Sequence, residues 1–332
     1  MIRVKRLAVI GAGGWGTALA TVARRAGTAA ILWARDPRIV GAINQSGQNP
    51  YYLPGVALDP AIIATSDTGA ALDAADAALL AVPAQSLRGV LERLRRHVHT
   101  GLPLLHCAKG IETGSLAMMS QVGRQVLPES PFAVLSGPSF AAEVARDLPA
   151  AVTIASADAA LAERFMAALG SSRFRPYLSL DCIGVEIGGA VKNVLAIACG
   201  IVVGRGLGEN ARAALITRGL AEMARLGIAR GAQAETFRGL SGLGDLVLTC
   251  TAGQSRNYAL GLLLGQGQSL DAALAGRRTV VEGVATAEAV AELTARLEIE
   301  MPICAAVEAV LHRGASIEAT TERLLSRPYR SE

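Results

Sequence analysis

The sequence predicts a two-domain protein, with an α/β domain followed by an all-helical domain. Three observations support this prediction. The chain has 332 residues, which is more than one hydrophobic core usually organises. Short apolar runs alternate with helical patterns up to about residue 180, and strand-like runs are absent after Asp181. We therefore expect residues 1–181 to form the α/β domain and residues 182–332 to form the helical domain.

The α/β prediction depends on a series of apolar runs of strand length that end near Gly, Pro, Asp or Ser. These runs cover residues 7–10, 29–33, 62–65, 77–82, 102–107, 132–135 and 152–155. Segments rich in Ala, Leu and Arg lie between most of them and are long enough to be crossover helices. This alternation is typical of a mostly parallel, doubly wound sheet with helices on both faces.

The second domain is predicted from helical periodicity, interrupted by glycine-rich joints near residues 204–208, 239–244 and 265–267. Its first segment, IGGAVKNVLAIACGIVVG at residues 187–204, is apolar enough to raise the question of a membrane span. A spanning helix needs about 20 apolar residues, and Lys192 and Asn193 interrupt a run that is already short. We interpret it as a core helix, in which a lysine is costly unless it has a function.

Composition and charge exclude several classes of function. The net charge of +4 is mild and the arginines are scattered, so we expect no nucleic-acid partner. The five cysteines are odd in number and include no C-x-x-C pair, which argues against a disulfide framework or a zinc site. His97 and His99 lie near no acidic or cysteine partner, so we expect no metal. The N-terminus does not resemble a signal peptide, and we expect a cytoplasmic protein.

The stretch LAVIGAGGWGTALA at residues 7–20 carries the first functional motif. Gly11, Gly13 and Gly16 match G-x-G-x-x-G directly after a predicted strand and before a predicted helix, as in Rossmann-type dinucleotide-binding domains. Gly11 permits a tight turn, Gly13 allows a pyrophosphate to approach the backbone, and Gly16 allows close packing of helix and strand. Gly14 removes a further side chain from this turn. The alternative is a glycine-rich turn that binds nothing.

The end of the second predicted strand bears on the choice between NAD and NADP. Arg35 occupies this position and Asp36 follows it. An acidic residue here usually holds the ribose hydroxyls of NAD, whereas an arginine can hold the 2′-phosphate of NADP. We expect an NADP(H)-capable site with NAD(H) not excluded. The alternative is that Arg35 covers the adenine or faces solvent.

Lysine is rare in this chain, since only Lys5, Lys109 and Lys192 are lysines among 32 basic side chains. An arginine stays protonated, whereas a lysine can be tuned to donate or accept a proton. Lys109 follows a predicted strand, at the edge where open α/β sheets bind ligands. Lys192 lies in the apolar helix, and the alternative is a snorkelling or ion-paired core lysine.

Two further stretches suit a small anion. SGPSF at residues 136–140 ends another strand, and residues 242–257 place Asp245 ahead of a Ser-Arg-Asn cluster that opens a helix. A guanidinium beside an amide at a helix N-terminus is a good phosphate clamp. Alone, each signal is weak, because Asp245 could be a helix cap and Arg256 a surface residue.

Taken together, these motifs resemble the soluble bacterial NAD(P)-dependent glycerol-3-phosphate dehydrogenases. The resemblance runs from Leu7 to about Arg323 and is carried, in order, by GAGGWGTALA, NPYYLPG, AVPAQ, AKGIE, LSGPSFAAEV, GGAVKNVLAIACGI, GLSGLGDLVLTC, QSRN and VVEGVATA. It implies dinucleotide contacts from Gly14, Trp15, Arg35, Lys109, Ala141, Arg256, Val281 and Glu282. It implies substrate contacts from Lys109, Gly137, Ser139, Lys192, Asp245, Ser255, Arg256 and Asn257. Lys192 matches the acid/base residue of the family, while Gly14 departs from a serine that many members carry.

The resemblance implies reversible hydride transfer at C2 between dihydroxyacetone phosphate and sn-glycerol 3-phosphate, with NADPH or NADH as donor and without a metal. It assigns the role of proton donor and acceptor to Lys192, with Lys109 and Asp245 as further candidate catalytic residues. It also implies a supply of glycerophosphate for phospholipids and a homodimer. Two alternatives are a reductase of the β-hydroxyacid or ketopantoate type, which would recognise a carboxylate, and a redox-sensing module that binds dinucleotide without turnover.

Overall fold

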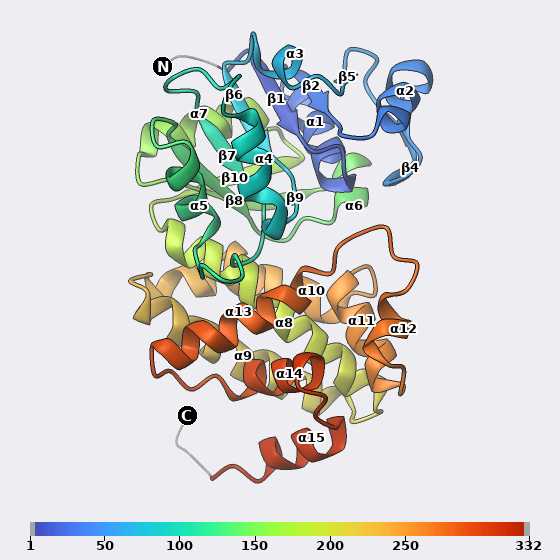
Figure 1. Cartoon of the computed structure of the whole chain (residues 1–332), viewed down its shortest axis with the longest axis vertical. Coiled ribbons are helices and arrows are strands. Elements are labelled where there is room, and N and C mark those ends of the chain that lie inside the picture. Colours follow the sequence, from blue (N-terminus) through green and yellow to red (C-terminus); the bar gives the residue numbers. More distant parts are fainter. Residues whose placement is uncertain (1–3, 329–332) are drawn as a thin grey trace. The chain divides into compact units, whose positions relative to one another are not determined.

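The computed structural model describes residues 4–328 and divides into two compact units (Figure 1). The first unit comprises the chain up to Lys109 together with Met118–Glu186, and the second comprises Gly110–Ala117 and the chain from Ile187 onward. The sequence predicts one division at 181/182. The units instead divide inside the helix that begins at Cys182, and a short earlier loop groups with the second unit.

The first unit is built on an eight-stranded sheet with the order β10-β9-β8-β7-β6-β1-β2-β5. All neighbouring strands are parallel except β8 and β9. The chain leaves β1 toward β2 on one side and continues from β6 on the other, so the strand order reverses at β1. Ligands of open α/β sheets bind at the carboxyl ends of strands at such a reversal. The strands are β1 (Arg6–Ile10), β2 (Ala29–Trp33), β5 (Ile63–Thr65), β6 (Ala77–Leu80), β7 (Leu104–His106), β8 (Phe132–Ser136), β9 (Ala150–Ala155) and β10 (Phe174–Ser179).

Both faces of this sheet are covered. Leu7 and Val9 of β1 share a buried cluster with residues of α1 and α7, while the alternate residues Ala8 and Ile10 are also fully buried. Burial of both faces explains why these strands read as continuous apolar runs. The helices are α1 (Gly14–Arg25), α2 (Pro37–Ser46), α3 (Thr68–Leu72), α4 (Leu87–Leu94), α5 (Met119–Val126), α6 (Ala141–Ala145) and α7 (Ala159–Leu169), with a 3₁₀ turn at Ala84–Ser86. The predicted doubly wound α/β fold is confirmed.

Every strand expected from the sequence is present, and two features were missed. The edge strand β10 contains Pro176, which lowers a strand prediction because proline cannot donate to a sheet ladder. The hairpin of β3 (Gln48–Asn49) and β4 (Leu53–Ala57) is too short and too rich in Pro and Gly for a periodic signal.

The described part of the second unit is helical, which confirms the predicted all-helical domain. Its helices are α8 (Cys182–Gly204), α9 (Glu209–Ala229), α10 (Asp245–Thr251), α11 (Arg256–Gly265), α12 (Leu270–Leu274), α13 (Glu282–Arg296), α14 (Pro302–His312) and α15 (Ile317–Leu325), with a 3₁₀ turn at Ala234–Arg238 and a π-helical turn at Leu240–Gly244. By length and composition α8 could cross a membrane, but 89% of its apolar window is buried inside the protein. It is therefore a core helix, as predicted.

Helices α8 and α11 pack backbone against backbone through glycines. A Cβ at Gly261 would lie 2.0 Å from the Ile197 carbonyl oxygen, and one at Gly265 would lie 2.6 Å from that of Ile201. A Cβ at Gly200 would lie 2.1 Å from the Tyr258 carbonyl oxygen. Because only hydrogen fits at these positions, the two helices approach closely in a fixed register. One turn before the Ile197–Gly261 contact, the same register pairs Asn193 with Asn257.

Candidate active site

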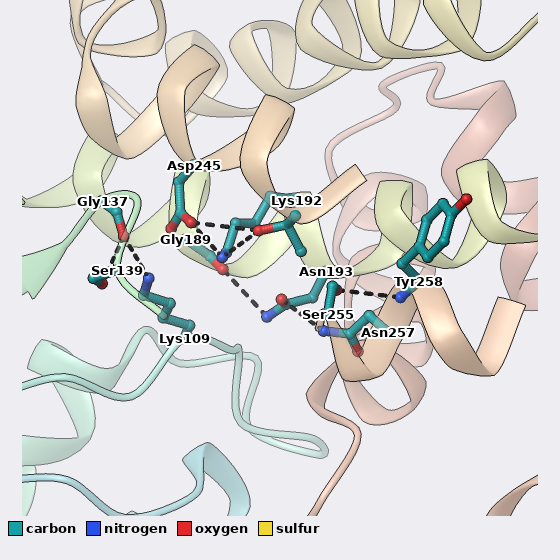
Figure 2. A network of polar contacts seen from close by, with 11 residues as sticks. Lys109, Gly137, Ser139, Gly189, Lys192, Asn193, Asp245, Ser255, Asn257 and Tyr258 are labelled. Atoms are coloured by element: carbon teal, nitrogen blue, oxygen red, sulfur yellow. Dashed lines mark hydrogen bonds and ion pairs between the residues drawn. The ribbon is translucent and has the colours of Figure 1, made fainter. Parts of the chain in front are cut away.

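Lys192 lies in a buried polar network inside the helical unit. Its Nζ donates to Asp245 Oδ1 at 2.6 Å and to Thr249 Oγ1 at 2.8 Å (Figure 2). The side chains of Lys192 and Asp245 are only 8% and 2% exposed. The ion pair is thus buried and has the Thr249 hydroxyl as a third polar partner. Lys192 is therefore an ion-paired lysine in an apolar helix, as both the catalytic interpretation and the alternative of an ion-paired core lysine predict.

The local backbone explains how Asp245 reaches Lys192. The π-helical turn Leu240–Gly244 directly precedes Asp245, and such turns are frequent at functional sites. A Cβ at Gly188, one turn before Lys192, would lie 2.4 Å from the Ser241 carbonyl oxygen. Glycine at this position lets the turn pack against α8. Asp245 then begins α10 facing the lysine, and Thr249 follows one helical turn later.

Residues Ser255, Arg256 and Asn257 open α11, as the sequence predicted. Ser255 caps the helix by accepting from the Tyr258 N–H at 3.2 Å. The exposed Arg256 donates from Nη1 to the Val280 carbonyl oxygen at 2.8 Å, which uses one of its five N–H groups. Asn257 is buried and donates to Asn193 Oδ1. The start of α11 therefore presents the Arg256 guanidinium and the Ser255 hydroxyl beside the Asn257 amide, which is held by its bond to Asn193.

The three motif glycines in the α/β unit have different surroundings. Gly11 has φ +113, and a Cβ there would lie 2.5 Å from the Ala81 carbonyl oxygen. At Gly16 a Cβ would lie 1.8 Å from the Gly11 carbonyl oxygen, whereas nothing lies within 4 Å of one at Gly13. The fold therefore requires glycine at 11 and 16, while Gly13 keeps space open. No side chain caps α1 at Gly13, so its first-turn N–H groups suit an anion.

Gly14, Trp15 and Ala141 lie beside the same turn. A Cβ at Gly14 would approach the Tyr52 carbonyl oxygen to 3.0 Å and the Ala141 Cβ to 3.7 Å. The glycine that departs from the family pattern therefore fits close contact with Tyr52 in this chain. The indole Nε1 of Trp15, in the first turn of α1, is buried without a hydrogen-bond partner among the described residues.

Arg35 and Asp36 follow β2, and the structure separates their roles. Arg35 is exposed. Asp36 accepts from the Arg38 N–H as the cap of α2, and its carboxylate also binds the Arg38 guanidinium, with Oδ2 at 2.7 Å from Nη2. Hydrogen bonds from Arg38 hold the pKa of Asp36 below its usual value. Both carboxylate oxygens of Asp36 thus bind Arg38, and Arg35 is the exposed side chain at the end of β2.

Lys109, Gly137 and Ser139 meet at the carboxyl ends of β7 and β8. Lys109 Nζ donates to the Gly137 carbonyl oxygen at 3.0 Å, and Ser139 Oγ donates to the same oxygen at 3.0 Å (Figure 2). Gly137 has φ +122, and a Cβ there would lie 3.1 Å from the Val152 Cα. The strand order places this cluster at the same sheet edge as the glycine turn.

Val281 and Glu282, the remaining predicted cofactor contacts, lie where α13 begins. Val281 is the buried N-cap residue and Glu282 is partly buried. They lie in the same unit as Arg256, whose guanidinium binds the preceding carbonyl at Val280. The second unit thus gathers two groups of predicted residues, one around Lys192 and one around the start of α11.

Sequence reasoning missed Thr249 and Asn193 as site residues. Thr249 lies four residues after Asp245, a spacing that places both on one helix face. Asn193 is an amide next to Lys192 in an apolar helix, and its burial at 5% exposure marks it as partnered. The spacing of Thr249 and the position of Asn193 beside Lys192 are visible in the sequence, but neither specifies the partner.

No group of three His, Cys, Asp or Glu side chains in residues 4–328 lies close enough to hold a metal ion. The five cysteines are free thiols. Burial raises the pKa of Cys107 to about 12, and burial followed by the charge of Glu186 raises that of Cys182 to about 11. These two thiols therefore remain protonated at neutral pH.

Comparison with known proteins covers both units. Residues 6–162 match the NAD-dependent glycerol-3-phosphate dehydrogenase N-terminus, and residues 181–322 match the corresponding C-terminus. A glycerol-3-phosphate dehydrogenase [NAD(P)+] from Rhodospirillum rubrum is 58% identical over 99% of this chain and 94% of its own length. One from Maricaulis maris is 54% identical over 100% and 99%. The crystal structure of glycerol-3-phosphate dehydrogenase from Coxiella burnetii has a TM-score of 0.93 and 40% identity, covering 97% of this chain and 99% of that one.

Proposed function

The chain belongs to the NAD(P)-dependent glycerol-3-phosphate dehydrogenases, and from this premise we propose which of its residues carry each part of the reaction. The resemblance read from the motifs is confirmed. The enzyme reduces dihydroxyacetone phosphate to sn-glycerol 3-phosphate with NADPH or NADH, and the reaction is reversible. The single observation that carries the proposed mechanism is the buried contact of Lys192 with Asp245 and Thr249.

The glycine turn fits the dinucleotide, because Gly13 leaves open the space that a Cβ would fill and the start of α1 is uncapped. We assign the pyrophosphate to the backbone at Gly11, Gly13, Gly14 and Gly16, with Trp15 and Ala141 beside it. We assign the 2′-phosphate of NADPH to Arg35 and further contacts to Lys109, Arg256, Val281 and Glu282. When bound, the nicotinamide supplies the hydride that C2 of the substrate accepts.

Lys192 donates and accepts the proton of the reaction. As C2 is reduced, its oxygen gains negative charge, which the Lys192 ammonium stabilises before donating a proton to it. In the oxidation direction, neutral Lys192 accepts the proton from the C2 hydroxyl. Asp245 and Thr249 fix the amine in one orientation through the contacts at 2.6 and 2.8 Å.

Charged and polar groups at the start of α11 bind the phosphate of the substrate. Arg256 supplies a guanidinium with further N–H groups beyond the one that binds the Val280 carbonyl oxygen. The Ser255 hydroxyl can donate its proton to the phosphate, because its Oγ only accepts from the Tyr258 N–H. Asn257 has a second amide N–H beyond the one donated to Asn193. Lys109, Gly137 and Ser139 complete the proposed substrate contacts.

Removal of the Arg256 guanidinium tests this assignment. Arg256→Ala should raise KM for dihydroxyacetone phosphate about 10- to 100-fold, the loss expected for hydrogen bonds between charged groups. With saturating NADPH, unphosphorylated dihydroxyacetone, a poor substrate, should be affected little. Arg296→Ala on the exposed end of α13 is the matched control and should behave as wild type. Equal losses for the two substrates would show that Arg256 is not the phosphate clamp.

We further propose that the enzyme is a cytoplasmic homodimer without nucleic-acid partners. Its product is the backbone of glycerophospholipids, and the family membership supports a role in their synthesis. Sedimentation of the purified protein tests the dimer, because a monomer at working concentrations would contradict it.

A further inference from the structure

Asn257 connects three helices of the second unit. From the first turn of α11, its Nδ2 donates to Asn193 Oδ1 on α8 at 2.8 Å (Figure 2). Its Oδ1 accepts from the backbone N–H of Gly283, in the first turn of α13, at 2.9 Å. Asn257 is 8% exposed and Asn193 5% exposed. One amide thus uses its donor on one helix and its acceptor on another.

The start of α13 depends on this acceptor. Helix N-termini leave N–H groups without intrahelical partners, which a side chain of the cap residue usually binds. The cap residue here is Val281, which has no polar side chain. Asn257 therefore caps α13 from a different helix. Glycine at 283 permits the contact, because a Cβ there would lie 2.7 Å from both Asn257 Oδ1 and the Asn193 carbonyl oxygen.

Arg256 holds the residue on the other side of the same segment. Its Nη1 donates to the Val280 carbonyl oxygen, while the adjacent Asn257 binds the Gly283 N–H. Two consecutive residues of α11 therefore fix both ends of residues 280–283. The glycine contacts between α8 and α11 hold α11 in register, so the segment is tied to the helix that carries Lys192.

We propose that Asn257 is a positioning residue for the dinucleotide. By capping α13 it fixes the positions of Val281 and Glu282, and through Asn193 it links them to α8, the helix that carries Lys192. The proposal rests on the proposed function, since it takes Val281 and Glu282 as cofactor contacts. It gives Asn257 a role in cofactor affinity besides its predicted contact with the substrate. Loss of the cap should weaken NADPH binding about three- to tenfold, as expected for one neutral hydrogen bond.

The test measures NADPH affinity in the absence of substrate, together with amide hydrogen exchange of residues 281–284. In wild type, bound NADPH should slow exchange in this segment. Asn257→Ala should speed exchange there about three- to tenfold without cofactor and raise the NADPH Kd by a similar factor. Asn257→Asp keeps an oxygen for the Gly283 N–H and should retain most of the protection at residues 281–284, while it loses the donor to Asn193. If Asn257 contacts only the phosphate of the substrate, neither variant should change the NADPH Kd.

Gly283→Ala tests the contact from the other side, since its Cβ displaces the start of α13 while Asn257 remains. It should raise the NADPH Kd at least as much as Asn257→Ala does, because its Cβ would meet both Asn257 Oδ1 and the Asn193 carbonyl oxygen. Gly253→Ala, where a Cβ meets nothing within 4 Å, is the control and should bind as wild type.

The proposal is overturned if NADPH leaves exchange at residues 281–284 of wild type unchanged, a result that needs no variant to fold. It is also overturned if Asn257→Ala speeds exchange while the NADPH Kd stays at the wild-type value. Failure of the proposed function would look different, because wild type itself would then show no NADPH oxidation with dihydroxyacetone phosphate.

Discussion

The glycines of the turn after β1 show how one residue type serves two purposes. Gly11 and Gly16 have backbone oxygens within 2.5 and 1.8 Å of a would-be Cβ, so they serve the fold. Gly13 has open space and a φ of −71, which any residue can adopt. The fold therefore does not require glycine at 13, and we attribute the missing side chain to the proposed ligand.

Gly13→Ala should consequently leave folding intact and impair the cofactor site. We expect an unchanged or slightly higher Tm and an NADPH Kd raised about 10- to 100-fold, the loss expected for displaced hydrogen bonds to a charged phosphate. Gly16→Ala is the comparison, and it should lower the Tm because its Cβ meets the Gly11 carbonyl. A Gly13→Ala protein that binds NADPH normally would contradict the assignment of the turn. Thermal melts and fluorescence titration measure both quantities.

Arg35 should set the preference between the two cofactors. Asp36 caps α2 and binds Arg38, so it is not available to the ribose hydroxyls that NAD-binding sites hold with a carboxylate. Arg35→Ala should raise the NADPH Kd about 10- to 100-fold, since a contact between charged groups is lost, and change the NADH Kd little. Equal losses for NADPH and NADH would exclude a role at the 2′-phosphate.

At the scale of elements, a buried carboxylate joins three segments of the α/β unit. Glu186 in the first turns of α8 accepts from the Ser120 N–H and Oγ at 2.7 Å each, next to the start of α5. Its Oε1 also lies 3.1 Å from His106 Nε2 at the end of β7. Burial opposes the charged carboxylate, but the contacts with His106 and Ser120 outweigh it and hold the pKa of Glu186 below its usual value.

This pKa predicts how stability depends on pH. A carboxyl with a lowered folded pKa stabilises the protein above its unfolded pKa, and the contribution is lost as the pH falls through the folded value. We therefore expect the wild-type Tm to fall below about pH 4.5, near the ordinary value for glutamate. Glu186→Gln should be less stable at pH 7 by about 1–3 kcal/mol, with a weaker decline in acid. If both proteins show the same decline in Tm, Glu186 does not carry this dependence.

The sequence predicted elements well where a local pattern determines them. Strands buried on both faces read as apolar runs, and the glycine turn and the start of α11 have local signatures. The paired Asn193 and Asn257 lie 64 residues apart, and Glu186 and Ser120 lie 66 apart. Such contacts depend on tertiary packing, which for Asn193 and Asn257 means the glycines between α8 and α11, and no local spacing encodes them.

At the scale of the whole molecule, the two compact units carry different parts of the proposed chemistry. The glycine turn and Arg35 belong to the α/β unit, whereas Lys192, Asp245 and Thr249 belong to the helical unit. Because the network around Lys192 is formed within one unit, its loss should affect proton transfer while the glycine turn stays intact. Cofactor binding and turnover should therefore be separable by substitution.

The most direct measurement is kcat for Lys192→Arg and Lys192→Met, with NADPH affinity and a thermal melt of each protein. Lys192→Arg keeps a positive charge beside Asp245, so the buried carboxylate stays paired, but a guanidinium does not exchange a proton at neutral pH. Lys192→Met keeps the apolar stem and removes the proton. We expect both proteins to bind NADPH and to turn over about 10²- to 10⁴-fold more slowly, with a lower Tm for Lys192→Met because it leaves the buried Asp245 carboxylate unpaired. Near-normal kcat in either variant would contradict the assignment of Lys192 as proton donor.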